Sequence, residues 1–354
     1  MHLDVLAYRA VLLIVAGSFV ASVGLTGLVR MFALRRDLID TPNSRSSHIA
    51  PTPTGGGAAV LLSIILALLA GGVLGITVWR DVITFVVGMT ALGAVGWLDD
   101  RHSVSAASRL TVHLLTALWT LARIGGFPTL SLGISVVPLG GFGWVLGVIG
   151  IVWSISLFNF MDGIDGLAGS QSIIIYGAAS AGLWYCGDPG LSFAAAVIAA
   201  ASAGFLIWNW PPAKIFLGDV GSGALGYLAA ALALTSENRG AMPLTAFAIL
   251  GGVLVADATV TLVRRVRAGH RPADAHREHA YQRLSRVWAS HKSVTLNAAI
   301  VSVFLTGLAA IATTSARMLL PALLVAALLL GALLVAIERR MPMRTSDSTT
   351  TRSP

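Results

Sequence analysis

The sequence predicts an all-α polytopic integral membrane protein. Of its 354 residues 56% are hydrophobic and only 11% are charged, whereas soluble domains carry about 25% charged residues. The apolar residues come in blocks of roughly 20, the length that crosses a bilayer as a helix. A segment inside lipid must satisfy its own backbone hydrogen bonds, so these blocks are expected to be helices.

About eleven spans follow from the apolar blocks, together forming one transmembrane domain over residues 1–340. They are expected at 6–29, 58–78, 82–98, 108–124, 141–160, 170–186, 191–208, 221–235, 243–263, 293–313 and 317–337. Residues 128–138 alternate between apolar and polar types around a glycine, which fits a short periplasmic β-hairpin or an irregular loop. The polar tail 341–354 is expected to be a disordered cytoplasmic segment.

Basic residues set the expected orientation. The first span is followed by Arg30, Arg35 and Arg36, and most of the 24 Lys and Arg residues fall in alternate loops on that same side. The positive-inside rule makes those loops and the C-terminus cytoplasmic and the N-terminus periplasmic. The net charge of +8 then belongs to the cytoplasmic face, where it suits anionic lipid or a phosphorylated substrate. Nucleic acid is not expected as a partner, because there is no soluble basic domain.

Carboxylates recur in the loops of this cytoplasmic side. Asp99 and Asp100 end the third span, Asp162 and Asp165 follow the fifth, and Asp219 lies in KIFLGDVGSG. Each could simply cap a helix. Their recurrence beside glycines instead favours a shared site, because ionisable residues at membrane depth usually face the protein interior. Several oxygen ligands and a single cysteine, Cys186, suggest Mg²⁺, with Mn²⁺ as the alternative.

The adjacent carboxylates of Asp99 and Asp100 repel each other. Either a cation holds one of them ionised, or its pKa rises and it can act as a base.

A basic segment is expected to form the second half of the site. In AHREHAYQRLSR (275–286), the residues His276, His279, Arg283 and Arg286 would share one face of a continuous helix. That face could be solvated, or it could bind phosphate. Lys214, one of two lysines, lies five residues before Asp219.

Four motifs occur here in the order found in one family. DD after the third span, NFMDGIDGLAG, NWPPAKIFLGDVGSG and the His-rich fifth cytoplasmic loop resemble the polyprenyl-phosphate N-acetylhexosamine-1-phosphate transferases over roughly residues 30–290. NSRSSHIAPTPTGGG and HREHAYQRL are most similar to the branch that initiates O-antigen from UDP-N-acetyl-6-deoxyhexoses. That resemblance implies a protein of the bacterial inner membrane.

The resemblance implies an activity: transfer of a sugar-1-phosphate from a UDP-N-acetylhexosamine, UDP-GlcNAc or a 6-deoxy analogue, to polyprenyl phosphate. Attack by the lipid phosphate itself and a covalent aspartyl intermediate both stay open. A homodimer is a further expectation.

The resemblance also implies roles for individual residues. The catalytic candidates are Asp99 as base, Asp100 in support, Asp162 and His279. Mg²⁺ would be held by Asp219 and Asp162. The substrate contacts would be Asn159, Asp165 near the uridine, Asn209, Lys214, Phe216 stacked on uracil, and His276 and Arg283, which with His279 hold the pyrophosphate.

Two other classes are compatible with the sequence. A secondary transporter also has glycine-broken helices and buried acids, but its ionisable groups should cluster near the bilayer midplane, whereas here they crowd one face. A membrane hydrolase of lipid phosphates is the alternative among enzymes.

Overall fold

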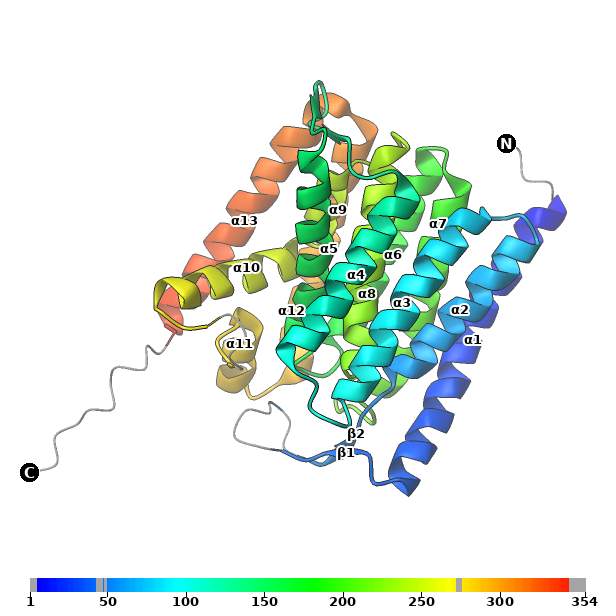
Figure 1. Cartoon of the computed structure of the whole chain (residues 1–354). Coiled ribbons are helices and arrows are strands. Elements are labelled where there is room, and N and C mark those ends of the chain that lie inside the picture. The colour runs from blue at the N-terminus through cyan, green and yellow to red at the C-terminus, as the bar shows by residue number, and fades with distance from the viewer. Residues whose placement is uncertain (1–4, 43–46, 48–49, 272–275, 344–354) are drawn as a thin grey trace, which may run out of the picture.

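The computed structural model describes residues 5–42, 47, 50–271 and 276–343. Most of this part of the chain is helical, and the long helices run side by side in one bundle (Figure 1). The helices are α1 (Val5–Arg35), α2 (Gly57–Val73), α3 (Trp79–Asp99), α4 (Ala106–Ile124), α5 (Phe142–Met161), α6 (Leu167–Tyr185), α7 (Pro189–Asn209), α8 (Asp219–Asn238), α9 (Leu244–Leu250), α10 (Gly252–Arg267), α11 (Ala280–Trp288), α12 (His291–Thr314) and α13 (Leu319–Arg340), with a 3₁₀ turn at Ala316–Met318.

Helix α8 lies at the centre of the bundle and is buried along most of its length. Small residues let its neighbours approach its backbone closely, as is usual for helices packed in lipid. A Cβ at Gly226 would fall well inside van der Waals contact of the Ser154 carbonyl on α5, and a Cβ at Gly57 of α2 would collide with the backbone of Gly221. Ser154 also donates a hydrogen bond to the Gly226 carbonyl at 2.6 Å.

Among the described residues, six helices are long and apolar enough to cross a membrane, or seven if the bent pair α9–α10 counts as one span. The prediction of a multi-pass helical membrane protein is therefore confirmed, but the count of eleven is not reached. The other helices are short or carry polar residues that bond inside the bundle. Gln171 of α6 accepts from Ser302 at 2.7 Å, and Tyr227 of α8 donates to the Thr84 carbonyl at 2.8 Å.

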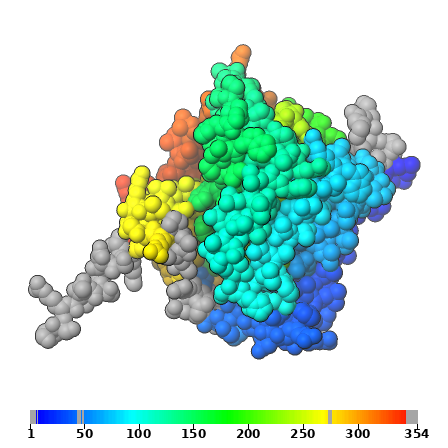
Figure 2. All heavy atoms as spheres, viewed as in Figure 1, coloured from blue at the N-terminus to red at the C-terminus, as the bar shows by residue number. Residues whose placement is uncertain are grey.

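The prediction of one continuous span at 243–263 is wrong. Helices α9 and α10 meet at Gly251 with a bend of 81°. Helix α10 therefore leaves the direction of the bundle (Figure 1), and its end, yellow in Figure 2, projects from the side. Gly252 makes this possible because a Cβ there would lie 2.9 Å from Leu330 and 3.0 Å from Leu305.

Two short antiparallel strand pairs occur in the described segments. Strand β1 (Ile39–Asp40) pairs with β2 (Thr52–Pro53) at one end of the bundle (Figure 1). Strand β3 (Thr129–Ser131) pairs with β4 (Val136–Pro138), inside the segment considered for a hairpin. The tail from residue 344 and the sequence 43–46 and 48–49 lie outside the described residues.

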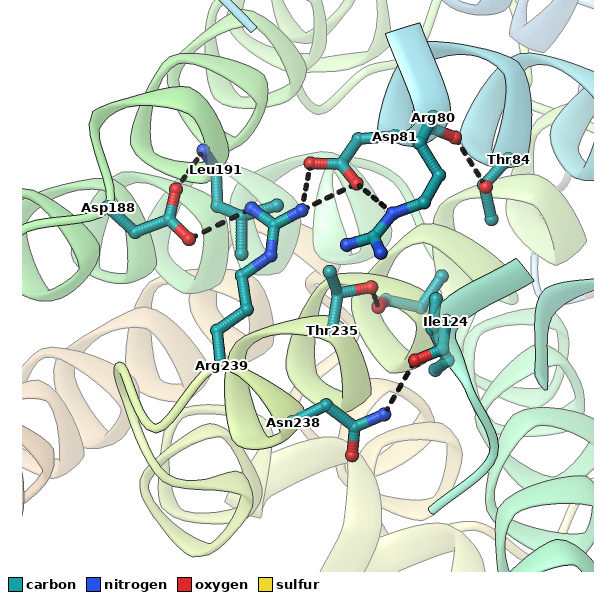
Figure 3. A network of polar contacts seen from close by, with 10 residues as sticks. Arg80, Asp81, Thr84, Ile124, Asp188, Leu191, Thr235, Asn238 and Arg239 are labelled. Atoms are coloured by element: carbon teal, nitrogen blue, oxygen red, sulfur yellow. Dashed lines mark hydrogen bonds and ion pairs between the residues drawn. The ribbon is translucent and has the colours of Figure 1, made fainter. Parts of the chain in front are cut away.

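A buried ionic cluster joins three helix ends at the opposite end from β1 and β2. Arg239, just after α8, donates to both carboxylate oxygens of Asp81 on α3 and, at 3.0 Å, to Asp188 at the start of α7 (Figure 3). The side chain of Asp81 is only 2% exposed. Asn238 donates to the carbonyls of Ile124 and Gly126, which adds the end of α4.

Candidate active site

The acidic loops meet around one cavity of about 250 Å³ at the end of the bundle that carries β1 and β2. The end of α3, the loop after α5, the α7–α8 loop and the starts of α11 and α12 all reach it. Its lining residues are Asp40, Ser47, Thr54, Asp100, Asp162, Gly163, Ile164, Asp165, Asn209, Phe216, Gly218, Asp219, Gln282 and His291. Residues more than 200 positions apart thus form one acidic cavity.

Asp100 fixes the start of α8. Its carboxylate accepts the backbone N–H of Asp219 at 3.0 Å and that of Val220 at 3.4 Å. Gly218 makes this approach possible because a Cβ there would lie 2.6 Å from Asp100, and its φ of 76° suits glycine. Asp100 therefore both caps a helix and lines the cavity, so the capping and functional interpretations of this residue are compatible.

Asp99 points to an arginine. Its Oδ2 is hydrogen-bonded to Arg109 of α4, and its Oδ1 accepts from the Val104 N–H at 2.8 Å. Arg109 also lies 3.6 Å from the carboxylate of Asp219. No role was predicted for Arg109, because an arginine one turn into a helix looks like any interfacial cation. Asp99 does not line the cavity, and both its oxygens have donors within the protein.

Carboxylates crowd the centre of the cavity. Burial, followed by the charges of Asp219, Asp100 and Asp165, raises the pKa of Asp162 well above its usual range. Burial, and after it the charge of Asp99, raises the pKa of Asp100, although the two backbone N–H groups it accepts oppose the shift. Asn159, on the last turn of α5, and Asp99 both interact with the side chain of Asp219. A cation bound among these groups would relieve their repulsion.

Asp165 is anchored on the far wall. Its Oδ2 accepts from the Ala213 N–H at 3.0 Å, and its Oδ1 lies 3.3 Å from Nδ1 of His291. The other ring nitrogen of His291 lies 3.2 Å from the Ser47 carbonyl. The sequence did not indicate His291, which begins α12 with no motif around it. Asn209 accepts from the Gly166 N–H at 2.9 Å and donates to the Ile215 carbonyl at 3.0 Å, so its amide holds the loop that carries Asp165.

The aromatic residue expected to stack on a base does reach the cavity. Phe216 lines it, and its backbone bonds to Pro53 of β2 and to Gly56, so the strand pair supports that wall. Lys214 lies elsewhere, with its ammonium 5.7 Å from the ring of Trp208, and does not line the cavity.

The prediction that His276, His279, Arg283 and Arg286 share a helical face is wrong. Helix α11 begins only at Ala280. The helix starts there because Asp257 of α10 accepts the N–H groups of Ala280 at 2.8 Å and Tyr281 at 3.0 Å. That partner comes from a different helix, so no local pattern could reveal it.

The basic residues of this segment lie outside the acidic cavity. His279 is buried, with Nδ1 3.5 Å from Asp257, and its ring lies 4.8 Å from that of His276. Arg283 donates to Glu338 and to the Met341 carbonyl, both at 2.6 Å. From the same segment, Gln282 reaches the cavity instead, although the sequence assigned it no role.

A second, mostly apolar cavity of about 310 Å³ lies beside the first. It runs between α10, α11, α12 and α13, and two pairs of chain neighbours lie between the two spaces. Met161 and Tyr281 line the apolar cavity, while their chain neighbours Asp162 and Gln282 line the acidic one. An amphiphile with a charged head could therefore occupy both.

Whether these residues suit Mg²⁺ depends on what else it binds. In the parts of the chain that the structure describes, no three His, Cys, Asp or Glu side chains are arranged to hold a metal ion by themselves. Mg²⁺ usually takes only one or two carboxylates, several waters and substrate phosphates. Asp162 and Asp219 both line the cavity and would supply two such carboxylates, so the donor set fits a shared Mg²⁺ site.

The comparisons with known proteins agree with this geometry. Residues 82–237 match Glycosyl transferase family 4. The chain is 32% identical over 307 residues to a decaprenyl-phosphate N-acetylglucosaminephosphotransferase of Mycolicibacterium smegmatis, covering 77% of this chain and 74% of that protein. It is 28% identical over 284 residues to a probable undecaprenyl-phosphate N-acetylglucosaminyl 1-phosphate transferase of Bacillus subtilis (77% and 76%). It is 32% identical over 287 residues to a phospho-N-acetylmuramoyl-pentapeptide-transferase of Streptomyces griseus (68% and 78%). The chain belongs to glycosyl transferase family 4, the polyprenyl-phosphate N-acetylhexosamine-1-phosphate transferases.

Proposed function

We propose that this protein transfers an N-acetylhexosamine-1-phosphate from a UDP-sugar to a polyprenyl phosphate and releases UMP. The observation that carries the proposal is the junction of an acidic cavity with an apolar one at one end of a membrane bundle. Sugar-1-phosphate transfer needs both a polar space for a nucleotide sugar and an apolar space for a lipid acceptor. Family membership supports the same reaction class.

The reaction exchanges one phosphoanhydride for another. An oxygen of the lipid phosphate bonds to the phosphorus that carries the sugar, and the bond from that phosphorus to the bridging oxygen breaks. UMP leaves with that oxygen and the electron pair. Both partners are anionic, so positioning and charge neutralisation carry most of the work. Bound Mg²⁺ would supply that neutralisation, held by Asp219 and Asp162.

The protein's own residues would position the substrates. Asp165, held by Ala213 and His291, and Phe216 form the wall proposed for the uridine. Asn209 fixes the loop between them, and Asn159 orients Asp219. Asp99 remains the proposed base with Asp100 beside it, but Asp99 can engage a ligand only by sharing or releasing Arg109.

The roles proposed for the basic residues differ with their positions. His279 contacts Asp257 and Tyr281, which line the apolar cavity, and His276 lies beside His279. From there they could meet the lipid phosphate or the pyrophosphate. Burial, followed by the charges of His279 and Arg265, lowers the pKa of His276 to about 4. It would therefore be neutral at pH 7 and act as a hydrogen-bonding group. Arg283 and Lys214 are engaged elsewhere, and we propose no direct substrate contact for them.

We further propose a cytoplasmic active site, because nucleotide sugars are made in that compartment and the cavity end carries most of the basic loops. The sugar would be N-acetylglucosamine or a 6-deoxy analogue, and the product would begin O-antigen or a related surface polysaccharide. The relatives named for N-acetylglucosamine support an N-acetylhexosamine. The O-antigen role is supported by NSRSSHIAPTPTGGG and HREHAYQRL, the two stretches that resemble the O-antigen-initiating branch of the family.

The test is a reaction with purified protein, polyprenyl phosphate, Mg²⁺ and a panel of UDP-N-acetylhexosamines. We expect equal amounts of UMP and lipid-linked sugar pyrophosphate. Release of UDP would indicate ordinary glycosyl transfer, and release of inorganic phosphate from the lipid alone would indicate a hydrolase. Either result would contradict the proposal. EDTA should stop the reaction, and added Mg²⁺ or Mn²⁺ should restore it.

A further inference from the structure

Gln282 presents an unused hydrogen-bond acceptor to the acidic cavity. Its side chain lines the cavity, yet the residue is only 8% exposed. Its Oε1 is buried and has no hydrogen-bond partner among the described residues. An unpaired buried amide oxygen costs free energy, so this position makes physical sense when something in the cavity donates to it.

The orientation of the amide follows from its neighbour. The hydroxyl of Tyr281 donates to the Phe160 carbonyl at 2.8 Å, so its proton is already used. The Tyr281 hydroxyl and Nε2 of Gln282 both lie close to Gly163, and the two side chains interact. The tyrosine oxygen can only accept in that contact. The NH₂ group of Gln282 must therefore be the donor to Tyr281. Oε1 is left as the group without a partner.

Among the described residues, no group of the cavity wall donates to this oxygen. The ionisable side chains around the centre are carboxylates, namely Asp100, Asp162, Asp165 and Asp219. In the ionised form, which a bound cation would favour, these groups only accept. The imidazole of His291 is held between Asp165 and Ser47. An N–H or O–H of a bound ligand would supply the missing donor.

We propose that Gln282 is a specificity-determining residue that accepts a hydrogen bond from the acetamido N–H of the donor sugar. This inference rests on the proposed function and adds to it the group that reads the sugar. All the UDP-N-acetylhexosamines considered above carry that N–H, so the inference holds whichever of them is used. A site built to bond an N–H rejects analogues lacking it, because its own polar atom is then left unpaired.

The experiment compares three ligands on four proteins. The ligands are the UDP-N-acetylhexosamine that the wild type turns over, UDP-glucose, which lacks the acetamido group, and UMP, which lacks the sugar. The proteins are the wild type, Gln282→Leu, Tyr281→Phe and Val287→Ala. Val287 lies on the same helix with its side chain 61% exposed, so it controls for general damage to α11. The readouts are kcat/KM for the sugar donor and inhibition constants for UDP-glucose and UMP.

Gln282→Leu should lower kcat/KM for the N-acetylhexosamine donor roughly tenfold to a hundredfold, the scale of one lost hydrogen bond in a closed site. Its inhibition constants for UDP-glucose and UMP should stay near those of the wild type. Tyr281→Phe releases the amide to rotate, so it should relax the preference for the N-acetyl sugar in the same direction but less. Val287→Ala should change nothing.

Three results would overturn the inference while leaving the proposed function intact. The first is an active wild type together with a Gln282→Leu variant of unchanged kcat/KM. The second is a Gln282→Leu variant that loses as much affinity for UMP as for the sugar donor. The third is a Gln282→Leu variant in which only the Mg²⁺ concentration needed for activity shifts. The second would assign Gln282 to the nucleotide and the third to metal-bound water. A wild type inactive with every UDP-N-acetylhexosamine would instead defeat the proposed function, and this inference with it.

Discussion

The carboxylate of Asp100 accepts the backbone N–H of Asp219 at 3.0 Å. With the bond from the Val220 N–H, it joins the end of α3 to the start of α8 and brings two motifs separated by more than 100 residues to the same cavity. The aspartate pair of one motif thus sets the position of the aspartate in the other. Effects of replacing Asp100 must therefore be separated into structural and chemical parts.

Two replacements of Asp100 should separate its two roles. Asp100→Ala removes both acceptor oxygens, so it should lower the stability by about 1 kcal/mol or more, the usual cost of a lost helix cap, and also lower activity. Asp100→Asn keeps one acceptor oxygen and should preserve most of the melting temperature. If the charge matters, activity should still fall at least tenfold. An asparagine variant with full turnover would reduce Asp100 to a cap.

Asp219→Asn should abolish transfer while the protein stays folded. The backbone N–H of residue 219, which bonds to Asp100, is unchanged, so the thermal midpoint in detergent should move little. Turnover should fall by a thousandfold or so, because an anionic group that orients the transferring phosphate is lost. Excess Mg²⁺ should restore little activity. Near-normal turnover at ordinary Mg²⁺ would remove Asp219 from the metal site.

Gly163→Ala should destabilise the protein, and Tyr281→Phe should relieve much of the damage. A Cβ at residue 163 would fall well inside contact distance of the Tyr281 hydroxyl oxygen, whereas the ring carbon behind that oxygen is 3.2 Å away. Overpacking of this kind costs roughly 1–3 kcal/mol. Thermal midpoints of both single variants and the double variant test the idea. A double variant no more stable than Gly163→Ala would show that the strain lies elsewhere.

Stability without Mg²⁺ should fall as the pH rises. The pKa values of Asp100 and Asp162 are raised by burial and by neighbouring acids, so the folded protein holds these protons more tightly than the unfolded chain does. That stabilisation is complete below the ordinary carboxyl pKa near 4 and is lost as the pH passes the raised values. Mg²⁺ binds the ionised groups, so the increase in melting temperature that it produces should grow between pH 5 and pH 8. Asp162→Asn should flatten the trend, and an increase independent of pH would contradict it.

Single cysteines should report the orientation of the bundle. In a Cys186→Ala background, Ser105→Cys, at the cavity end, should resist a membrane-impermeant thiol reagent in intact cells and react once the cells are opened. Ile134→Cys, between β3 and β4 with the native side chain 78% exposed, should react in intact cells. The reverse pattern would place the acidic cavity outside and contradict a cytoplasmic nucleotide-sugar site.

Composition and motif order were enough to predict the membrane class, the family and the gathering of Asp100, Asp162, Asp165 and Asp219. Apolar block length and carboxylates beside glycines are local properties, so they can be read without a structure. The break at Gly251 could not be predicted, because the residues around it are as apolar as those of a straight span.

The start of α11 was missed for a different reason. It depends on Asp257, which lies on another helix. The polar residues that the sequence did not indicate, Arg109, Gln282 and His291, owe their places to such long-range partners rather than to any motif.

The cluster around Arg239 bears on how the enzyme could open and close. Helices α3 and α8 are tied at one end by Asp100 and at the other by the bond from Arg239 to Asp81. These two attachments, at opposite ends of the same helix pair, oppose sliding or pivoting of one helix against the other. We therefore expect any movement that admits the lipid or releases its product on the opposite side, where α10 bends away from the bundle and α11 is short. The wall of the cavity that carries Asp219 would then stay fixed, and the wall that carries Gln282 would move.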